Sequence, residues 1–116
     1  WAILEGMVGV QQFVTIGQHS FVAGGSMVRK NIPPFVKAAR EPLSFIGVNS
    51  IGLRRRGFDN EQVVNIEDIY RTLYVQNGNI SQALRVAETE LPHSDEKTIV
   101  LGFISASDKG IIRGPF

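Results

Sequence analysis

A six-residue repeat near the N-terminus constrains the fold of this chain more than any other feature. From Ile3 onward the sequence divides into the hexads ILEGMV, GVQQFV, TIGQHS, FVAGGS and MVRKNI. Neither the 3.6-residue period of a helix nor the two-residue period of a simple strand explains such a pattern. The second position of every hexad is aliphatic: Leu4, Val10, Ile16, Val22 and Val28.

This repeat predicts the coils of a left-handed parallel β-helix, in which each hexad forms one flat side of a triangular prism. Three hexads complete one coil, so Val22 should stack on Leu4 and Val28 on Val10. Solenoids of this kind need at least about three repeats, because each coil buries its core only against its neighbours. The chain starts within a hexad, so we expect further coils before Trp1. Glycines that accept a positive φ are expected at the corners: Gly6, Gly17, Gly24 and Gly25.

Two consecutive prolines, Pro33 and Pro34, follow the last hexad. Because proline cannot donate a main-chain hydrogen bond, we expect the pair to end the β-helix. The predicted organisation is therefore residues 1–34 as β-helix coils, residues 35–42 as a connecting loop, and residues 43–116 as a small helical domain. The fold class is β + α.

Four helices are expected in the last of these parts. The first covers residues 43–56 and ends at Gly57, with an inward face of Phe45, Val48, Ile51 and Leu53. The second begins at Asp59 in a capping box with Gln62, stops at Gly78, and buries Val63, Ile66, Ile69, Tyr70 and Leu73. The third begins near Asn79 or Ser81 and runs to Pro92, with Ile80, Leu84, Ala87 and Leu91. The fourth begins at Ser94, ends at Gly110, and carries Ile99, Val100, Phe103 and Ile104.

Composition excludes several classes of protein. The chain is 43% hydrophobic, which argues against disorder, and it has no apolar run of the ~18–20 residues that a membrane span needs. It has no cysteine, which excludes thiol catalysis, disulfides and cysteine-ligated zinc. No signal peptide is recognisable, so a cytoplasmic location is expected.

Charge is unevenly distributed along the chain. Residues 1–58 carry a net charge of +5 and residues 59–116 carry −4, which together give the formal +1. A basic first half suggests an anionic partner, such as a phosphate-bearing ligand or an acidic protein, although an ordinary solvated surface explains it equally well.

Three segments resemble one family, the UDP-N-acetylglucosamine O-acyltransferases. They are GMVGVQQFVTIG with FVAGGSMVRKNIPPF, then GVNSIGLRRRGF, and finally SDKGIIR. Many acyltransferases share the hexads, whereas the GLRRRGF element is far more specific.

The resemblance implies the C-terminal part of a cytoplasmic homotrimer. Such an enzyme transfers a 3-hydroxyacyl chain from acyl carrier protein to the 3-hydroxyl of UDP-N-acetylglucosamine, the first step of lipid A synthesis, without a metal or other cofactor. Its general-base histidine is expected upstream of Trp1, so this chain alone should be inactive. His19 and His93 are expected to be ordinary surface residues.

The resemblance also implies two sets of site residues. Arg55 and Arg56, with Arg54 and Asn49, are expected near the UDP moiety, because guanidinium donors suit a diphosphate. The competing interpretations are a basic helix end and a helix-capping asparagine. A second set is expected to line the acyl and pantetheine groove: Gln12, Gly24 and Phe21. Gly24 would leave that groove open to a long acyl chain, although a corner glycine required by φ alone is a serious rival.

Three positions depart from the family pattern as we describe it. Gln11 replaces a histidine, Arg40-Glu41-Pro42 replaces a loop with a contact histidine, and Ile51 replaces a carboxylate.

Two other functions compete with the acyltransferase. One is a non-catalytic trimerisation or scaffold module built on the hexads. The other is nucleic-acid binding through the arginine run, which the few basic residues and the absence of interleaved aromatic residues disfavour.

Overall fold

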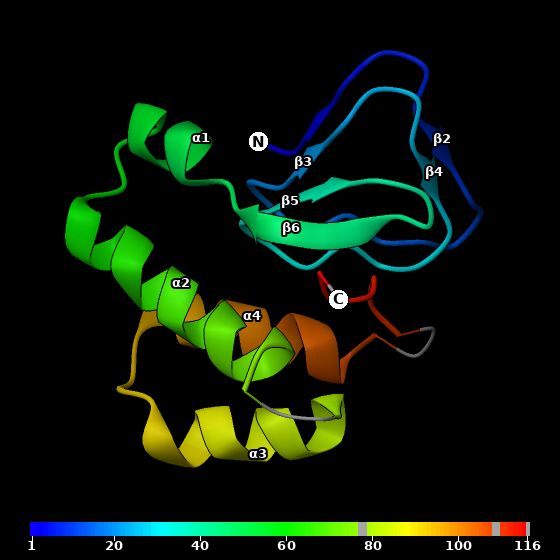
Figure 1. The fold of residues 1–116 in the computed structure, drawn as a ribbon. Coiled ribbons are helices and arrows are strands. Elements are labelled where there is room, and N and C mark those ends of the chain that lie inside the picture. The colour runs from blue at the N-terminus through cyan, green and yellow to red at the C-terminus, as the bar shows by residue number, and fades with distance from the viewer. Residues whose placement is uncertain (77–78, 108–109, 116) are drawn as a thin grey trace.

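The computed structural model describes residues 1–76, 79–107 and 110–115. Coils of extended chain lie at one end of the molecule, and most of the helical residues lie at the other (Figure 1). Within the described residues the elements are β1 (Ile3–Leu4), β2 (Gly9–Val10), β3 (Phe21–Val22), β4 (Met27–Val28), β5 (Val36–Ala39), β6 (Ser44–Val48), α1 (Ser50–Arg55), α2 (Asn60–Tyr74), α3 (Ile80–Glu90) and α4 (Asp95–Ser105).

The hexads stack as predicted. β1 pairs in parallel with β3, and β2 pairs in parallel with β4, so that Leu4 lies beside Val22 and Val10 beside Val28. Val22 and Val28 are 0% and 1% exposed, whereas Leu4 and Val10 are 42% and 45% exposed. The difference follows from the stacking, because Val22 and Val28 have a coil above them and further chain below.

The corners of the coils differ from the prediction. Among the four glycines expected there, only Gly25 has a positive φ. A left-handed conformation instead recurs at the fifth position of the first four hexads, whatever the residue: Met7, Phe13, His19 and Gly25. Repeated pairing of the coils therefore imposes this conformation even on bulky residues, for which it is unusual.

Gly17 has a different reason to be glycine. A Cβ built on it would lie 2.4 Å from the Pro34 nitrogen and 2.8 Å from the Ile32 carbonyl oxygen. Such distances leave no space for a side chain, since the backbone of the next coil passes directly over this residue. The restriction at Gly17 is therefore a close approach between chains and not a positive φ.

The prolines do not end the coils, which corrects the prediction for residues 35–42. Pro33 and Pro34 are buried. Beyond them the Phe35 amide donates to the Gln18 carbonyl at 2.9 Å, and β5 then pairs in parallel with β3. Each proline removes only its own donor, and the ladder resumes at the next residue. Where a loop is expected, the chain continues the stack for one more strand.

The helix predicted for residues 43–56 is also wrong over its first half. Residues 44–48 form β6, which pairs antiparallel with β5 and completes a sheet in the order β1-β3-β5-β6. Only Ser50–Arg55 is helical. Phe45 and Leu53 are buried as expected, but Ile51 is 60% exposed. The apolar spacing fits a helix, but the open edge of β5 supplies hydrogen-bond partners that local sequence does not reveal.

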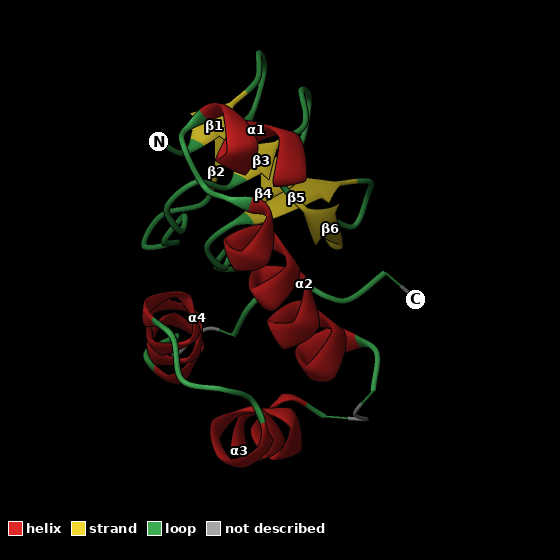
Figure 2. Ribbon diagram, turned by 90° about the vertical axis from the view of Figure 1, so that its left-hand side faces the viewer, coloured by secondary structure: helices red, strands yellow, loops and turns green. Residues whose placement is uncertain are grey.

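The remaining helices follow the sequence closely. The capping box between Asp59 and Gln62 is present, and Asn79 and Ser94 cap α3 and α4 with their side chains. The predicted apolar face of α2 is buried. Figure 2 shows α3 and α4 lying against α2, away from the strands. The predicted stop at Gly78 lies outside the described residues.

The fourth helix differs in detail. It ends at Ser105 rather than at Gly110. Ile99 is 38% exposed, while Leu101 is buried beside Val100 and Ile104. The buried residues of α4 lie on one face: Glu96, Lys97, Val100, Leu101 and Ile104. Because apolar residues also flank this face, the apolar pattern alone did not fix which side points inward.

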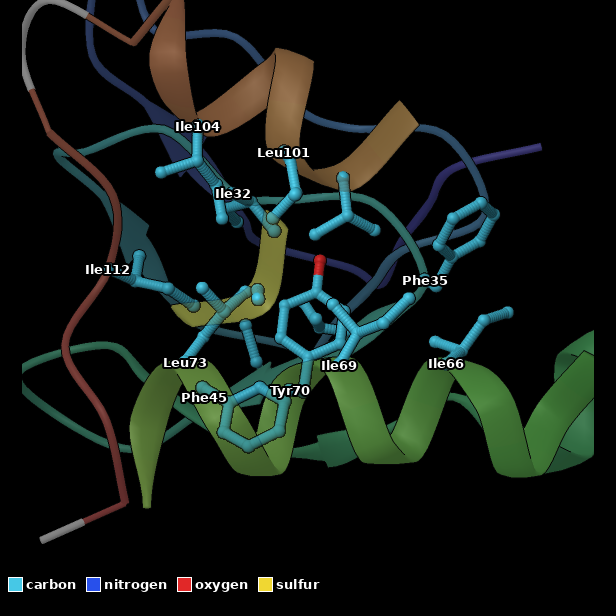
Figure 3. Packing of buried hydrophobic residues seen from close by; sticks show 14 of the residues in the cluster. Ile32, Phe35, Phe45, Ile66, Ile69, Tyr70, Leu73, Leu101, Ile104 and Ile112 are labelled. Atoms are coloured by element: carbon cyan, nitrogen blue, oxygen red, sulfur yellow. The ribbon is translucent and has the colours of Figure 1, made fainter. Parts of the chain in front are cut away.

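Coils and helices share one hydrophobic core, part of which Figure 3 shows. The Tyr70 hydroxyl donates to the Pro34 carbonyl at 2.5 Å, and the Phe45 ring stacks on Tyr74 with centroids 4.6 Å apart. The chain then returns to the coils, where Ile111 bridges to Asn31 and Arg113 to Ser44. Whether the coils and the helices form separate domains stays a prediction.

Candidate functional site

A pocket of about 450 Å³ lies between α1 and one outer face of the coils. Figures 1 and 2 show α1 beside the N-terminal strands at this place. The walls of this pocket come from the first residues of the chain, from three stacked strands and from α1 with its flanking residues. The lining residues are Trp1, Ile3, Phe21, Lys37, Asn49, Ile51, Gly52, Arg55 and Arg56.

The coil wall is a column of register partners. Ile3 pairs with Phe21 in β1 and β3, and Phe21 pairs with Lys37 in β5. Successive strand residues point to opposite faces, so these three point outward while their neighbours, such as Val22, point into the core. The stacking thus places an isoleucine, a phenylalanine and a lysine side by side on one face, about 4.8 Å apart.

The helix wall is fixed at Asn49. This residue occupies the N-cap position of α1, yet its side chain makes no capping bond. Its Nδ2 donates instead to the His19 carbonyl at 3.1 Å, and the residue is 6% exposed. A Cβ on Gly52 would lie 2.6 Å from the same Nδ2. The simple capping interpretation of Asn49 is therefore excluded, and Gly52 provides the space that this side chain occupies.

Three cations face the pocket, and no carboxylate is among its lining residues in the part of the chain described. Arg55 is exposed, and neither its side chain nor that of Lys37 has a hydrogen-bond or ion-pair partner within the described residues. Unpaired guanidinium and ammonium groups beside an aromatic and an aliphatic wall suit an anionic ligand with a flat or apolar part. Lys37 was missed, since it lies in the segment interpreted as a loop.

His19 was also missed. It is half-buried at a coil corner, where its ring stacks on Phe35 and contacts the edge of Phe58. Its Nδ1 lies 2.9 Å from Nη1 of Arg56. Burial and the charge of Arg56 lower the pKa of His19 from its usual 6.5. The expectation of an ordinary surface residue is wrong for His19, whereas His93 is exposed as expected.

The structure brings some predicted site residues together and leaves others apart. Asn49, Arg55 and Arg56 share the pocket with Phe21, which was expected in the acyl groove. Arg54, on the same helix, turns away and donates to Asn60 Oδ1 at 3.1 Å.

The other two groove residues lie outside the pocket. Gln12 is exposed on the coils. Gly24 is exposed as well, and its amide donates to Glu5 Oε1 at 3.2 Å. Its φ is not positive, so the rival interpretation of a glycine required by φ does not hold. A Cβ there would lie 3.2 Å from the Gly6 carbonyl oxygen, a tight but adjustable contact.

The residues that depart from the family pattern have distinct surroundings. Gln11 is exposed, and Ile51 forms part of the pocket wall where a carboxylate was expected. Arg40 reaches the Pro115 carbonyl at 3.4 Å, and Glu41 accepts from Arg29 at 2.8 Å. The Arg40-Glu41 segment therefore makes contacts within the chain.

Two absences hold for the described residues only. They contain no group of three or more histidine and acidic side chains placed to hold a metal ion. None of their helices combines the length and the apolar character needed to cross a bilayer.

Comparison with known proteins gives a consistent result. Residues 31–112 match the family model described as UDP N-acetylglucosamine O-acyltransferase, domain 2. The chain is 44% identical over 119 residues to the acyl-(acyl-carrier-protein)–UDP-N-acetylglucosamine O-acyltransferase of Burkholderia lata, and 32% identical over 111 residues to that of Myxococcus xanthus. These matches cover 97% and 96% of this chain but only 45% and 43% of the relatives.

Solved structures of UDP-N-acetylglucosamine acyltransferases superpose on this chain over almost its whole length. A UDP-N-acetylglucosamine acyltransferase from Bacteroides fragilis superposes with a TM-score of 0.93 at 44% identity, over 97% of this chain and 44% of that one. The enzyme from Francisella novicida superposes with a TM-score of 0.90 at 31% identity, over 98% of this chain and 42% of that one. The predicted fold class is confirmed: coils of a left-handed parallel β-helix followed by helices.

Proposed function

This chain belongs to the UDP-N-acetylglucosamine O-acyltransferase family, and from that premise we propose that it supplies the sugar-nucleotide side of an acyltransferase site. The reaction proposed is transfer of a 3-hydroxyacyl chain from acyl carrier protein to the 3-hydroxyl of UDP-N-acetylglucosamine, the first step of lipid A synthesis. The chain spans less than half the length of its relatives. The proposal therefore concerns the enzyme of which this chain is a part.

The observation that carries the proposal is the gathering of Lys37, Arg55 and Arg56 around one pocket. A sugar nucleotide carries two negative phosphate charges, and its base and ribose present flat and apolar surfaces. Arginine binds phosphate through two parallel N–H donors, and lysine adds a point charge. The neighbouring Phe21 and Ile51 offer contact area for the less polar parts of the ligand.

In the proposed reaction a general base removes the proton of the sugar 3-hydroxyl. That oxygen attacks the thioester carbonyl, an ester forms, and the carrier thiol leaves with a proton. We propose that the base comes from outside this chain, within a cytoplasmic homotrimer that needs no cofactor. The residues described here bind and orient the acceptor, while Gln12 and Gly24 belong to the acyl side.

The pocket favours this function over the two alternatives. A module that only trimerises has no use for two unpaired cations in a recess. A nucleic-acid surface would spread its cations along an open stripe with stacking aromatic residues, whereas here they converge on one recess. Scaffold activity alone would leave sugar-nucleotide affinity undetectable.

Arg55→Ala tests the proposal in the full-length protein by calorimetric titration with UDP-N-acetylglucosamine. We expect the Kd to rise about tenfold or more, because a charge-assisted contact to phosphate is lost. Arg54→Ala is the matched control, since it removes the same group from the same helix but outside the pocket. If Arg55→Ala binds as tightly as the unsubstituted protein, or if Arg54→Ala loses as much affinity, the proposed site is wrong.

A further inference from the structure

We propose that His19 is a positioning residue that holds the Arg56 guanidinium and the Asn49 amide in place at the pocket. The inference rests on the proposed function, because the groups that His19 holds are two of the proposed sugar-nucleotide contacts. His19 itself is not among the residues that line the pocket.

The contact with Arg56 fixes the chemical state of the ring. Nδ1 of His19 lies 2.9 Å from Nη1 of Arg56. Arginine has only donors and stays charged, so Nδ1 must accept the hydrogen bond. The ring is therefore neutral and carries its proton on Nε2 while this bond exists. The lowered pKa of His19 agrees with that state.

The same residue holds Asn49 through its main chain. The side-chain Nδ2 of Asn49 donates to the His19 carbonyl at 3.1 Å, and the main-chain amide of Asn49 donates to the Phe35 carbonyl at 2.8 Å. One corner of the coil thus fixes the start of α1 with a carbonyl and the end of α1 with an imidazole.

His19 is itself held firmly enough for this task. Its φ of 57° belongs to the corner conformation that the stacked coils impose. Its ring lies 6.0 Å from the Phe35 ring in a stacked arrangement and 5.1 Å from the Phe58 ring edge-on. The ring therefore acts as a fixed acceptor and not as a mobile surface group.

Arg56 is held from a second side. Its guanidinium carbon lies 5.6 Å from the centre of the Trp1 ring, within the range of a cation–π contact. One of five N–H donors points to His19, and the others stay available. A guanidinium restrained before binding loses less freedom when the ligand arrives, and affinity rises accordingly.

Two substitutions separate the acceptor from the ring. His19→Phe keeps an aromatic ring between Phe35 and Phe58 but removes the acceptor, and this chain already places Phe13 and Phe35 at a positive φ. His19→Asn removes the ring but puts an oxygen near the position of Nδ1, on a residue type that tolerates the left-handed conformation. Acceptor and packing are thus lost one at a time.

The experiment is titration of the full-length variants with UDP-N-acetylglucosamine at pH 7.5, with unsubstituted protein and Arg55→Ala alongside. We expect His19→Phe to raise the Kd about tenfold, and His19→Asn to recover most of that loss. In an Arg56→Ala background His19→Phe should change the Kd less than twofold, because the group that it positions is gone.

The outcomes are distinguishable. If Arg55→Ala leaves the Kd unchanged, the proposed function fails. If Arg55→Ala weakens binding while His19→Phe does not, or if the effect of His19→Phe persists undiminished without Arg56, only the positioning role is overturned. Should His19→Phe fail to fold, ¹⁵N spectra of the unsubstituted protein decide. Protonation at Nε2 supports the inference, and protonation at Nδ1 refutes it.

Discussion

His19 shows how much a single residue of a coil can carry. The corner conformation turns its ring away from the prism axis and toward α1, while its carbonyl faces Asn49. The other corner residues use the same conformation differently, because Met7 and Phe13 are 91% and 78% exposed. The fifth position of the first four hexads is thus a place where the fold accepts different side chains in one backbone conformation.

Gly24 gives a prediction at the same scale. We expect Gly24→Met in the full-length enzyme to shift preference toward shorter 3-hydroxyacyl donors, because a side chain there would occupy part of the proposed acyl groove. Folding should be little affected, since the residue is exposed and its φ suits any amino acid. Competition assays with acyl carrier proteins that bear 3-hydroxyacyl chains of different length measure the shift. An unchanged donor preference would remove Gly24 from the acyl side.

At the scale of elements, the contact between α2 and the coils decides how the two parts join. Tyr70 is 1% exposed, and its hydroxyl reaches a carbonyl of the buried Pro33-Pro34 segment. Figure 3 shows this oxygen pointing from α2 into the core. This hydrogen bond to Pro34 therefore joins α2 to the coils at the two prolines.

Tyr70→Phe tests that contact. It removes one hydroxyl and leaves the Pro34 carbonyl buried without this donor, so the free energy of unfolding should fall by about 1–3 kcal/mol. Urea denaturation followed by circular dichroism measures the loss. The ring still packs against Phe45, so the m-value should not change. A variant as stable as the parent would show that the hydrogen bond contributes little.

For the molecule as a whole, the C-terminal segment ties the coils to the helices. Ile112 is 3% exposed, its amide donates to the Asn31 carbonyl, and its carbonyl accepts from Tyr74. The Phe45 amide of β6 donates to the Arg113 carbonyl. Ile112 also belongs to the hydrophobic core that the coils and the helices share, so truncating its side chain should weaken both parts together.

Ile112→Ala is the corresponding variant. We expect the free energy of unfolding to fall by about 2–5 kcal/mol, as for other isoleucines truncated in a core. Amides of the coils, such as Ala23, and of α2, such as Leu73, should lose protection by similar amounts in hydrogen exchange. Ile99→Ala is the control, because Ile99 is 38% exposed and should cost much less. Loss of protection in the helices alone would contradict a shared core.

The sequence by itself determined the coils, three helices with their caps, and most of the cationic pocket. These features rest on short-range signals: an aliphatic residue every six positions, capping residues beside apolar faces, and the arginine run of GLRRRGF. Arg55, Arg56 and Asn49 were identified through that motif and lie together as expected.

Only the tertiary structure decided the rest. β5 and β6 exist because the edge of β3 offers a ladder to a segment whose own pattern is indistinct. Lys37 enters the pocket because β5 stacks in register with β3, and Arg54 turns away from it to donate a hydrogen bond to Asn60 Oδ1. His19 meets Arg56 across 37 residues of chain through a corner conformation that stacking imposes. Apart from the Arg54–Asn60 contact and the pairing of β5 with β6, each of these features depends on a partner distant in sequence, which leaves no trace in local periodicity.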